Sequence, residues 1–219
     1  MDVFMKLTLK KVTVTPIRQN CTILSNQLGR AVIIDPGGES TRLAQEAEAL
    51  HVEAILLTHG HLDHVGGAAE LKRLLEARQS NEVPILGPVK DDLFLLQHVE
   101  EQAASLGLGG MKNVKPDRFL KDREVLSFLG CEFEVAHIPG HTPGHVVFLL
   151  PEEKIALTGD TLFRGTVGRT DFPYGNERQL LEGIWERLFC LPDETIVLPG
   201  HGLPTTIGEE RRHNPAFQQ

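Results

Sequence analysis

The sequence lacks a long apolar segment, an N-terminal leader pattern and an excess of positive charge. No apolar run approaches the roughly 20 residues that a membrane-spanning helix needs, so we expect no transmembrane segment. The first residues show no apolar core followed by small residues, so no secretory signal is expected. The 22 Lys and Arg against 30 Asp and Glu give a net charge of −8, which argues against a nucleic-acid-binding protein with a basic surface.

Cysteine is also scarce. Cys21, Cys131 and Cys190 are far apart, and no two of them form a Cys-x-x-Cys pair. The pattern therefore predicts neither a disulfide framework nor a thiolate zinc site. Unpaired thiols fit a reducing compartment, and we expect a cytoplasmic protein. No heptad or exposed apolar stripe predicts an oligomeric state.

The sequence does contain a regular alternation of β-branched runs and helical patterns. Runs at residues 12–17 and 21–24 predict a β-hairpin, because a short polar stretch separates them. Further apolar runs predict strands at residues 30–34, 54–57, 131–138, 146–150, 155–157 and 195–198. Apolar residues at helical spacing predict helices at residues 40–50, 66–78, 92–106 and 180–188. No linker divides this pattern, which indicates one layered α/β domain over residues 1–219.

Ten histidines are present, and their placement is the most informative feature of the sequence. Residues 58–64, Thr-His-Gly-His-Leu-Asp-His, follow a predicted buried strand, a position where ligand sites in layered α/β proteins lie. Residues two apart in an extended chain point the same way, so His59 and His61 can reach one metal ion. Asp63 and His64 come where the chain turns into a helix. They therefore approach from another direction and could hold a second ion.

Three further predicted strands end in a histidine or aspartate beside glycine. These residues are His141 and His201, each in Pro-Gly-His, and Asp160 in Thr-Gly-Asp. Glycine permits the tight turn that aims such a side chain inward. Imidazole and carboxylate donors without thiolate suit Zn²⁺, Fe²⁺ or Mn²⁺. The four segments together predict a metal centre at a shared edge of the sheets.

Two more residues near these motifs are candidates for supporting roles. His145 follows His141 in Gly-His-Thr-Pro-Gly-His, and we expect it to pack behind the ligands rather than to be one. Asp35 stands in an Asp-Pro-Gly turn after a predicted strand. It either orients a ligand histidine or serves the turn alone, and the sequence leaves both roles open.

The four motifs resemble those of the metallo-β-lactamase-fold hydrolases, and most closely the short bacterial glyoxalase II (hydroxyacylglutathione hydrolase) type. The resemblance runs from about Thr13 to Phe217 and implies a four-layer αββα sandwich, of class α/β (α+β), with the metal site between two sheets. It implies two sets of ligands, which are His59, His61 and His141 for the first metal and Asp63, His64 and His201 for the second. Asp160 resembles the carboxylate that bridges the two metals.

The resemblance also implies an activity, the hydrolysis of S-D-lactoylglutathione to D-lactate and glutathione in methylglyoxal detoxification. Two metal ions that share a water lower its pKa towards about 7, and the resulting metal-bound hydroxide would attack the thioester. The implied cofactor is Zn²⁺, as one or two ions, with Fe²⁺ or Mn²⁺ as alternatives. Asp63 and Asp160 are the expected catalytic carboxylates. Arg164, Arg169 and Tyr174 follow Asp160, and we expect them to bind a small, anionic, glutathione-type thioester.

The chain departs from the longer glyoxalase II proteins. It continues for eighteen residues past His201, so we expect no C-terminal helical domain that binds glutathione. The Lys-x-Tyr segment of those proteins is replaced by Arg169-Thr170-Asp171. Residues 168–172, Gly-Arg-Thr-Asp-Phe, instead resemble the mononuclear iron persulfide dioxygenases of the same fold, which are the alternative function. Those dioxygenases tend to carry cysteine at the position of His145, which favours hydrolysis.

Overall fold

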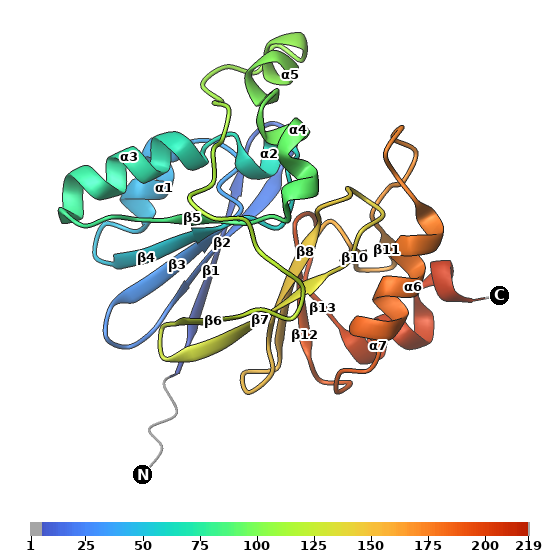
Figure 1. The fold of residues 1–219 in the computed structure, drawn as a ribbon. Coiled ribbons are helices and arrows are strands. Elements are labelled where there is room, and N and C mark those ends of the chain that lie inside the picture. The colour runs from blue at the N-terminus through green and yellow to red at the C-terminus, as the bar shows by residue number, and fades with distance from the viewer. Residues whose placement is uncertain (1–5, 219) are drawn as a thin grey trace.

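Two mixed β-sheets pack face to face in the structure, a computed structural model that describes residues 6–218 (Figure 1). Helices cover the outer side of each sheet. The first sheet has the strand order β1-β2-β3-β4-β5, and the second has the order β13-β12-β9-β8-β7-β6. This arrangement confirms the expected four-layer αββα sandwich.

The elements have the following bounds. The first sheet consists of β1 (Thr8–Val14), β2 (Gln19–Ser25), β3 (Arg30–Ile34), β4 (His51–Leu56) and β5 (Ile85–Leu86). The second consists of β6 (Val125–Phe128), β7 (Cys131–His137), β8 (Val146–Leu150), β9 (Ile155–Gly159), β12 (Ile196–Pro199) and β13 (Thr205–Thr206). A separate hairpin contains β10 (Leu162–Phe163) and β11 (Thr166–Val167). The α-helices are α1 (Ser40–Glu46), α2 (Leu62–Val65), α3 (Ala68–Gln79), α4 (Leu93–Leu96), α5 (Val99–Ser105), α6 (Glu177–Arg187) and α7 (Ile207–His213), with 3₁₀ turns η1 (Lys90–Asp92) and η2 (Pro215–Phe217).

Central strands of both sheets are buried on both faces, and their alternate residues serve different layers. In β3, Ala31 and Ile33 pack in the cluster that contains α1 and α3, whereas Val32 faces the second sheet. In β8, Phe148 faces the first sheet, and Val147 packs in the cluster that contains α6. Side chains alternate along a strand, so a four-layer sandwich needs strands that are apolar on both sides. This requirement explains the continuous apolar runs in the sequence.

The strands that precede the histidine and aspartate motifs end at one edge of the sandwich. β7, β9 and β12 run in the same direction, because β7 and β9 are both antiparallel to β8 and β9 is parallel to β12. The first sheet reaches the same edge, where the N–H of Val146 donates to the carbonyl of Thr58 (2.8 Å). A second link between the sheets runs from the N–H of Asn20 to the carbonyl of Gly200 (2.7 Å). Motifs that are far apart in the sequence are thereby brought to one place.

The single helix expected at residues 92–106 is wrong. The chain instead forms the 3₁₀ turn η1 followed by two short helices, α4 and α5. Tertiary hydrogen bonds interrupt the helical ladder. The carbonyl of Leu96 accepts from the N–H of Val114 (3.0 Å), and the N–H of Glu100 donates to the side chain of Asn113 (2.9 Å). In a continuous helix the N–H of Glu100 would donate to the carbonyl of Leu96.

Other boundaries shift by a few residues. The predicted hairpin is present as β1 and β2, but Ile17 lies in the turn, where Thr15 and Arg18 have positive φ angles of 63° and 64°. The helix predicted from residue 66 is preceded by a separate turn of helix, because α2 ends at Val65 and α3 begins at Ala68. The sequence pattern does not predict several short elements, among them β5, β6, β10, β11, β13 and α7.

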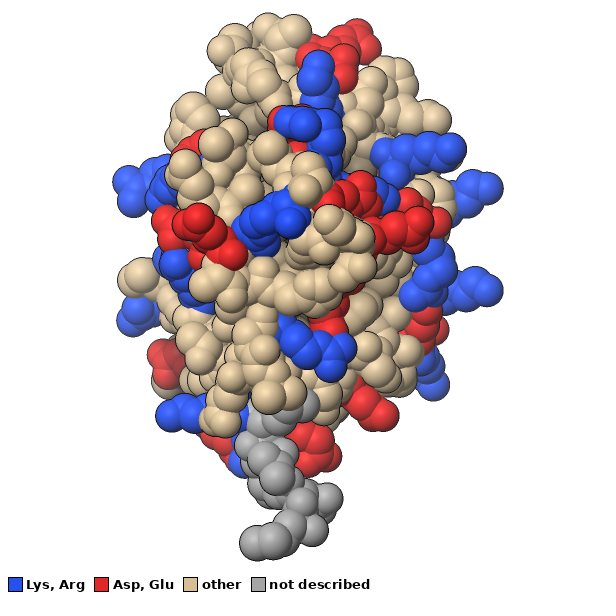
Figure 2. All heavy atoms as spheres, turned by 90° about the vertical axis from the view of Figure 1, so that its left-hand side faces the viewer, with Lys and Arg blue, Asp and Glu red and all other residues tan. Residues whose placement is uncertain are grey.

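Helix length, the state of the thiols and the distribution of surface charge can be compared with the expectations from the composition. Among residues 6–218 no helix has the length and apolar character needed to cross a membrane. All three cysteines have free thiols, of which Cys21 and Cys131 are buried and Cys190 is exposed. On the face that Figure 2 shows, Lys and Arg side chains are interspersed with Asp and Glu.

Replacement of Gly37 by alanine tests the close packing at the edge that carries the motifs. A Cβ atom at Gly37 would lie 1.4 Å from the carbonyl oxygen of Asp63, which requires the backbone to move. We expect Gly37→Ala to lower the free energy of unfolding by about 2 kcal/mol or more, measured by urea denaturation. A Cβ atom at Gly109 meets nothing within 4 Å, so Gly109→Ala is the control. Equal stability of the two variants would contradict this packing.

Candidate metal centre

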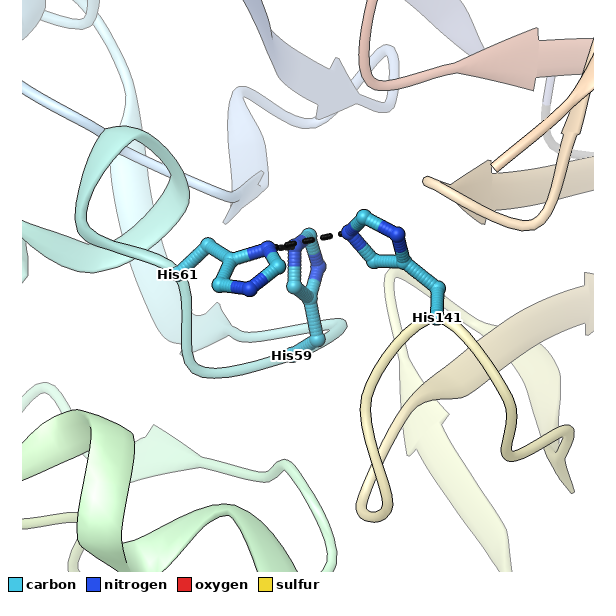
Figure 3. A group of neighbouring side chains, drawn as sticks. All are labelled: His59, His61 and His141. Carbon is cyan, nitrogen blue, oxygen red and sulfur yellow. Dashed lines mark hydrogen bonds between the residues drawn. The ribbon is translucent and has the colours of Figure 1, made fainter. Parts of the chain in front are cut away.

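Three histidine nitrogens face one another where the loops after β4 and β7 meet (Figure 3). Nδ1 of His61 lies 3.0 Å from Nε2 of His59 and 2.9 Å from Nε2 of His141. His59 and His61 come from the loop after β4, and His141 comes from the loop after β7. The structure therefore brings together the three residues that the family resemblance implies for a first metal.

The outer nitrogens of two of these rings determine where their protons are. Nδ1 of His141 lies 2.8 Å from the carbonyl oxygen of Arg169 and must donate to it, so a neutral His141 has no proton on Nε2. Thr58 donates its hydroxyl to Asp35 (2.6 Å) and therefore accepts from Nδ1 of His59 (3.0 Å). Nε2 of a neutral His59 is then also unprotonated. Two lone pairs thus face Nδ1 of His61, which can donate its single proton to only one of them at a time, and a cation among the three nitrogens would satisfy all three.

Burial keeps the three rings neutral. It lowers the pKa of His61 to about 3, and the neighbouring His141 adds to this shift. Burial, together with the nearby His64, also lowers the pKa of His59 well below its usual value. The pKa of His141 is lowered as well, again mainly by burial. Neutral imidazole is the form that coordinates a metal ion.

A second group, made of Asp63, His64 and His201, lies beside the first. Oδ2 of Asp63 is 3.1 Å from Nε2 of His201 and 3.8 Å from Nε2 of His64. Nδ1 of His64 lies 2.9 Å from Oδ2 of Asp35, which accepts its hydrogen bond. Of the two roles that the sequence leaves open for Asp35, the structure therefore shows the orientation of a ligand-type histidine.

Asp160 lies between the two groups. Its Oδ1 is 3.3 Å from Nε2 of His64, and its Oδ2 is 3.6 Å from Nε2 of His141 and 3.7 Å from Nε2 of His201. Burial opposes the charge of this carboxylate, but the neighbouring His64 and His141 lower the pKa of Asp160 far below its usual value. Burial also opposes a charge on His64, whose pKa is nevertheless raised by Asp160 and Asp63. Positive charge is therefore favoured between these side chains.

The donor atoms fit divalent cations. Within residues 6–218, Nε2 of His64 and Oδ1 of Asp160 are buried without a hydrogen-bond partner, which is costly unless another group binds them. Nitrogen ligands of tetrahedral zinc lie about 3.3 Å apart, given bond lengths of about 2.05 Å. The inner nitrogens of the first group have a similar spacing. Imidazole and carboxylate without thiolate also suit iron and manganese.

Glycines let the backbone approach these side chains. A Cβ atom at Gly200, directly before His201, would lie 2.4 Å from Oδ1 of Asp160 and 2.4 Å from a ring carbon of His64. Gly159, directly before Asp160, has a φ of +49°, a conformation that side-chain-bearing residues rarely adopt. The glycines beside the predicted ligands are thus needed both for the turn and for the space that the ligands occupy.

His145 is buried beside the first group, where its Nε2 has a hydrogen-bond partner and its Nδ1 has none among residues 6–218. Its ring stacks on that of His59 with 4.6 Å between the centroids. Its Nε2 accepts a hydrogen bond from the N–H of Asp160 (2.9 Å). That nitrogen is therefore occupied, and His145 packs behind the candidate ligands as the sequence predicts.

Asp92 is a supporting residue that the sequence pattern does not single out. Its Oδ2 accepts from the N–H of Gly60 (2.8 Å) and from the hydroxyl of Thr142 (2.7 Å), and its Oδ1 accepts from the N–H of Gly144 (2.6 Å). The carboxylate thereby ties the loop of His59 and His61 to the loop of His141. Burial raises the pKa of Asp92 to about 6, although these hydrogen bonds oppose the shift. No local signal marks Asp92, because its partners are distant in sequence.

A groove of about 820 Å³ opens over the two groups, and the three predicted substrate-binding residues line it. Arg164 is exposed on the turn between β10 and β11. Arg169 is also exposed but pairs with Asp171 at 2.8 Å. The hydroxyl of Tyr174 lies 3.0 Å from Nε2 of His61, so it contacts a candidate ligand as well as the groove. The roles of these three residues in substrate binding stay predictions.

The fold and the paired His and Asp groups define a class of protein. The model of the metallo-β-lactamase superfamily matches residues 14–201 of this chain, a span that includes all the candidate ligands. The chain belongs to this superfamily, as the sequence motifs predict. The cluster is a metal-binding site of the kind typical of dinuclear centres in the superfamily.

Three individual proteins are similar to the chain over nearly its full length. The chain is 45% identical to the hydroxyacylglutathione hydrolase GloC of Haemophilus influenzae, over 95% of this chain and 97% of that protein. It is similar to the solved structure of the BLEG-1 B3 metallo-β-lactamase, with a TM-score of 0.85 and 33% identity over 97% of this chain and 100% of that chain. It is also similar to TTHA1623 in a di-iron-bound form, with a TM-score of 0.81 and 39% identity over 94% and 98% of the two chains.

Asparagine at position 92 tests the link between the ligand loops. The amide has one acceptor oxygen and turns its NH₂ group towards N–H donors, so at least one of the three hydrogen bonds is lost. We expect Asp92→Asn to lower the affinity for a divalent metal by about 10- to 100-fold, measured by competition with a chelator. The exposed neighbour provides the control variant, Asp91→Asn, which keeps wild-type affinity. Wild-type affinity in Asp92→Asn would show that the link is dispensable.

The variant Tyr174→Phe tests whether the tyrosine hydroxyl orients His61 or binds the substrate. A metal ion held between the three histidines would bind Nδ1 of His61 without its proton, so Nε2 would then carry the proton and donate to the Tyr174 oxygen. Loss of this acceptor should lower the metal affinity by about 10-fold, measured by the same chelator competition. Unchanged metal affinity together with a raised KM would instead assign the hydroxyl to the substrate.

Proposed function

We propose that the protein is a metal-dependent thioester hydrolase that converts S-D-lactoylglutathione to D-lactate and glutathione. The proposal rests on the pair of adjacent His and Asp groups, with Asp160 between them, beneath an open groove. The name of the relative from H. influenzae, a hydroxyacylglutathione hydrolase, supports the choice of substrate.

Two divalent ions fit the donor set. His59, His61 and His141 would hold one ion, Asp63, His64 and His201 would hold the second, and Asp160 would be shared. When bound, such ions lower the pKa of a water molecule and polarise a carbonyl oxygen. Zinc is our first candidate, and iron is the alternative because a similar protein is solved in a di-iron-bound form.

The residues of the chain orient the ligands and the substrate. The Arg169 carbonyl and the Thr58 hydroxyl hold the outer ring protons, which leaves the inner nitrogens free. Arg164 is available for a substrate carboxylate, whereas Arg169 is engaged by Asp171. In the reaction a C–O bond to water forms and the C–S bond breaks. The thiolate leaves without a strong general acid, because the pKa of a thiol is only about 8.5.

Persulfide dioxygenation is the competing function. A single iron held by the first group would suffice for it, and residues 168–172 resemble those enzymes. The chain also presents a complete second group, Asp63, His64 and His201, with ligand atoms close together. Two filled sites are what a hydrolase uses to place a water beside a carbonyl, so the second group supports hydrolysis.

Purified protein is assayed with S-D-lactoylglutathione for thiol release, and with glutathione persulfide for O₂ uptake. We expect thiol release without O₂ consumption, loss of activity after chelation, and recovery on addition of zinc. O₂ consumption without thiol release would overturn the proposal.

Variants at two aspartates control this assay. Asp160→Asn should lower kcat/KM by about 100-fold or more and lower the metal content per chain, because it removes the carboxylate shared by both groups. The exposed Asp91→Asn keeps wild-type values. Full activity in Asp160→Asn would place catalysis elsewhere.

A further inference from the structure

Two chemically different sets of side chains line the groove over the metal centre. The charged set contains Arg164 and Arg169, both from the segment after β9. The second set is apolar and contains Ile17, Leu106 and Leu203. The proposed substrate, S-D-lactoylglutathione, has a carboxylate for Arg164, but its short hydroxylated acyl group gives the apolar set little to contact.

The apolar set is unusually exposed. Ile17, Leu106 and Leu203 have exposed fractions of 44%, 60% and 59%. They are three of nine large apolar side chains that are exposed among residues 6–218, yet they line one groove. Single exposed apolar residues are common, whereas several that converge on a concave site indicate binding of an apolar group.

Three separate segments supply this set, and hydrogen bonds join the first two of them. The turn with Ile17 and the loop with Leu203 flank an antiparallel bridge between Gln19 and His201. The side chain of Asn20 ties the same loop down by donating to the carbonyls of Pro199 (3.1 Å) and Gly202 (3.0 Å).

Leu106 comes from the third segment, directly after α5. Residues 107–111 that follow it line a cavity together with Thr15 and Pro16, so this segment faces the turn of Ile17 across that cavity. The helix α5 is held in place by the hydrogen bond of Glu100 to Asn113 (2.9 Å). The apolar side chains thus form a rim that the fold builds, which we call the apolar rim (Ile17, Leu106 and Leu203).

We propose that the apolar rim is a subsite for an apolar substituent of the thioester substrate. The proposal rests on the hydrolase function above. A substrate is the occupant because the rim and the candidate ligands His61, Asp63, His141, Asp160 and His201 line one continuous groove. The three rim residues are apolar, whereas Arg164 is exposed and has no ion pair among residues 6–218, so it can bind an anionic group. The chain therefore favours thioesters that combine one anionic end with an apolar chain of several carbons.

Two series of thioesters identify which side of the substrate is apolar. In the first, glutathione carries acetyl, butanoyl or hexanoyl groups. In the second, one carboxyl group of succinate forms the thioester with methanethiol, butanethiol or hexanethiol, so that each compound keeps an anionic end. We expect kcat/KM to rise about two- to fourfold per methylene along one series, which reflects burial of each CH₂ group against the rim. The series that rises shows whether the acyl group or the thiol occupies the subsite.

Binding of thioethers tests the subsite without turnover. S-Hexylglutathione and S-methylglutathione cannot be hydrolysed, and calorimetry gives their Kd values. We expect the hexyl compound to bind about 10-fold or more tightly if the acyl side is apolar, in agreement with the first series. Equal Kd values together with no rise along either series would overturn the subsite.

Serine variants connect the preference to the rim. Leu106→Ser and Leu203→Ser should each flatten the rise of kcat/KM with chain length. Leu28, exposed by 72% on the turn between β2 and β3 and absent from the groove lining, provides the control Leu28→Ser, which keeps the full slope. A full slope in both rim variants would also reject the subsite. If the wild-type protein hydrolyses no thioester of either series but still binds S-hexylglutathione more tightly than S-methylglutathione, the hydrolase function is rejected and the subsite is kept.

Discussion

At the centre of the site, the Nε2 atoms of His59 and His141 both face Nδ1 of His61. Hydrogen bonds to the Arg169 carbonyl and to Thr58 fix the protons of His141 and His59 on their outer nitrogens. Burial keeps the imidazoles neutral, so they cannot relieve the contact by taking up a second proton. A divalent cation is the partner that satisfies such a set of donors. The architecture around the centre can be understood as the means of holding these atoms together in the folded state.

The sandwich holds the ligand atoms together through the direction of its strands and through close backbone contacts. Three strands of the second sheet run the same way, and hydrogen bonds at Thr58 and Asn20 join the two sheets at the edge where these strands end. At positions 37 and 200, the absence of a side chain lets the backbone pack directly against the candidate ligands. Asp92 then ties two ligand loops to each other. Precise placement of the donors therefore comes from packed loops on rigid strands.

Features with a local signature could be predicted from the sequence. The dense motif at residues 58–64 and the Gly-His and Gly-Asp pairs predict metal ligands at strand ends. The continuous apolar runs predict strands that are buried on both faces. The break between α4 and α5 could not be predicted, because distant residues Val114 and Asn113 take the backbone hydrogen bonds that would continue the helix. The same holds for Asp92 and for the contact of Tyr174 with His61, since each joins segments separated by tens of residues.

The order of the residues is enough to predict which chemical groups are present, in what local order, and on which strands and turns they lie. Those properties depend on neighbours along the chain, and periodicity and glycine placement record them. The folded chain, in contrast, is needed to see which ligand atoms meet, which hydrogen bonds hold the outer ring protons of His59 and His141, and which side chains form the apolar rim. These properties depend on distances between segments that are far apart in the chain, and such distances arise only when the two sheets pack and their edges align.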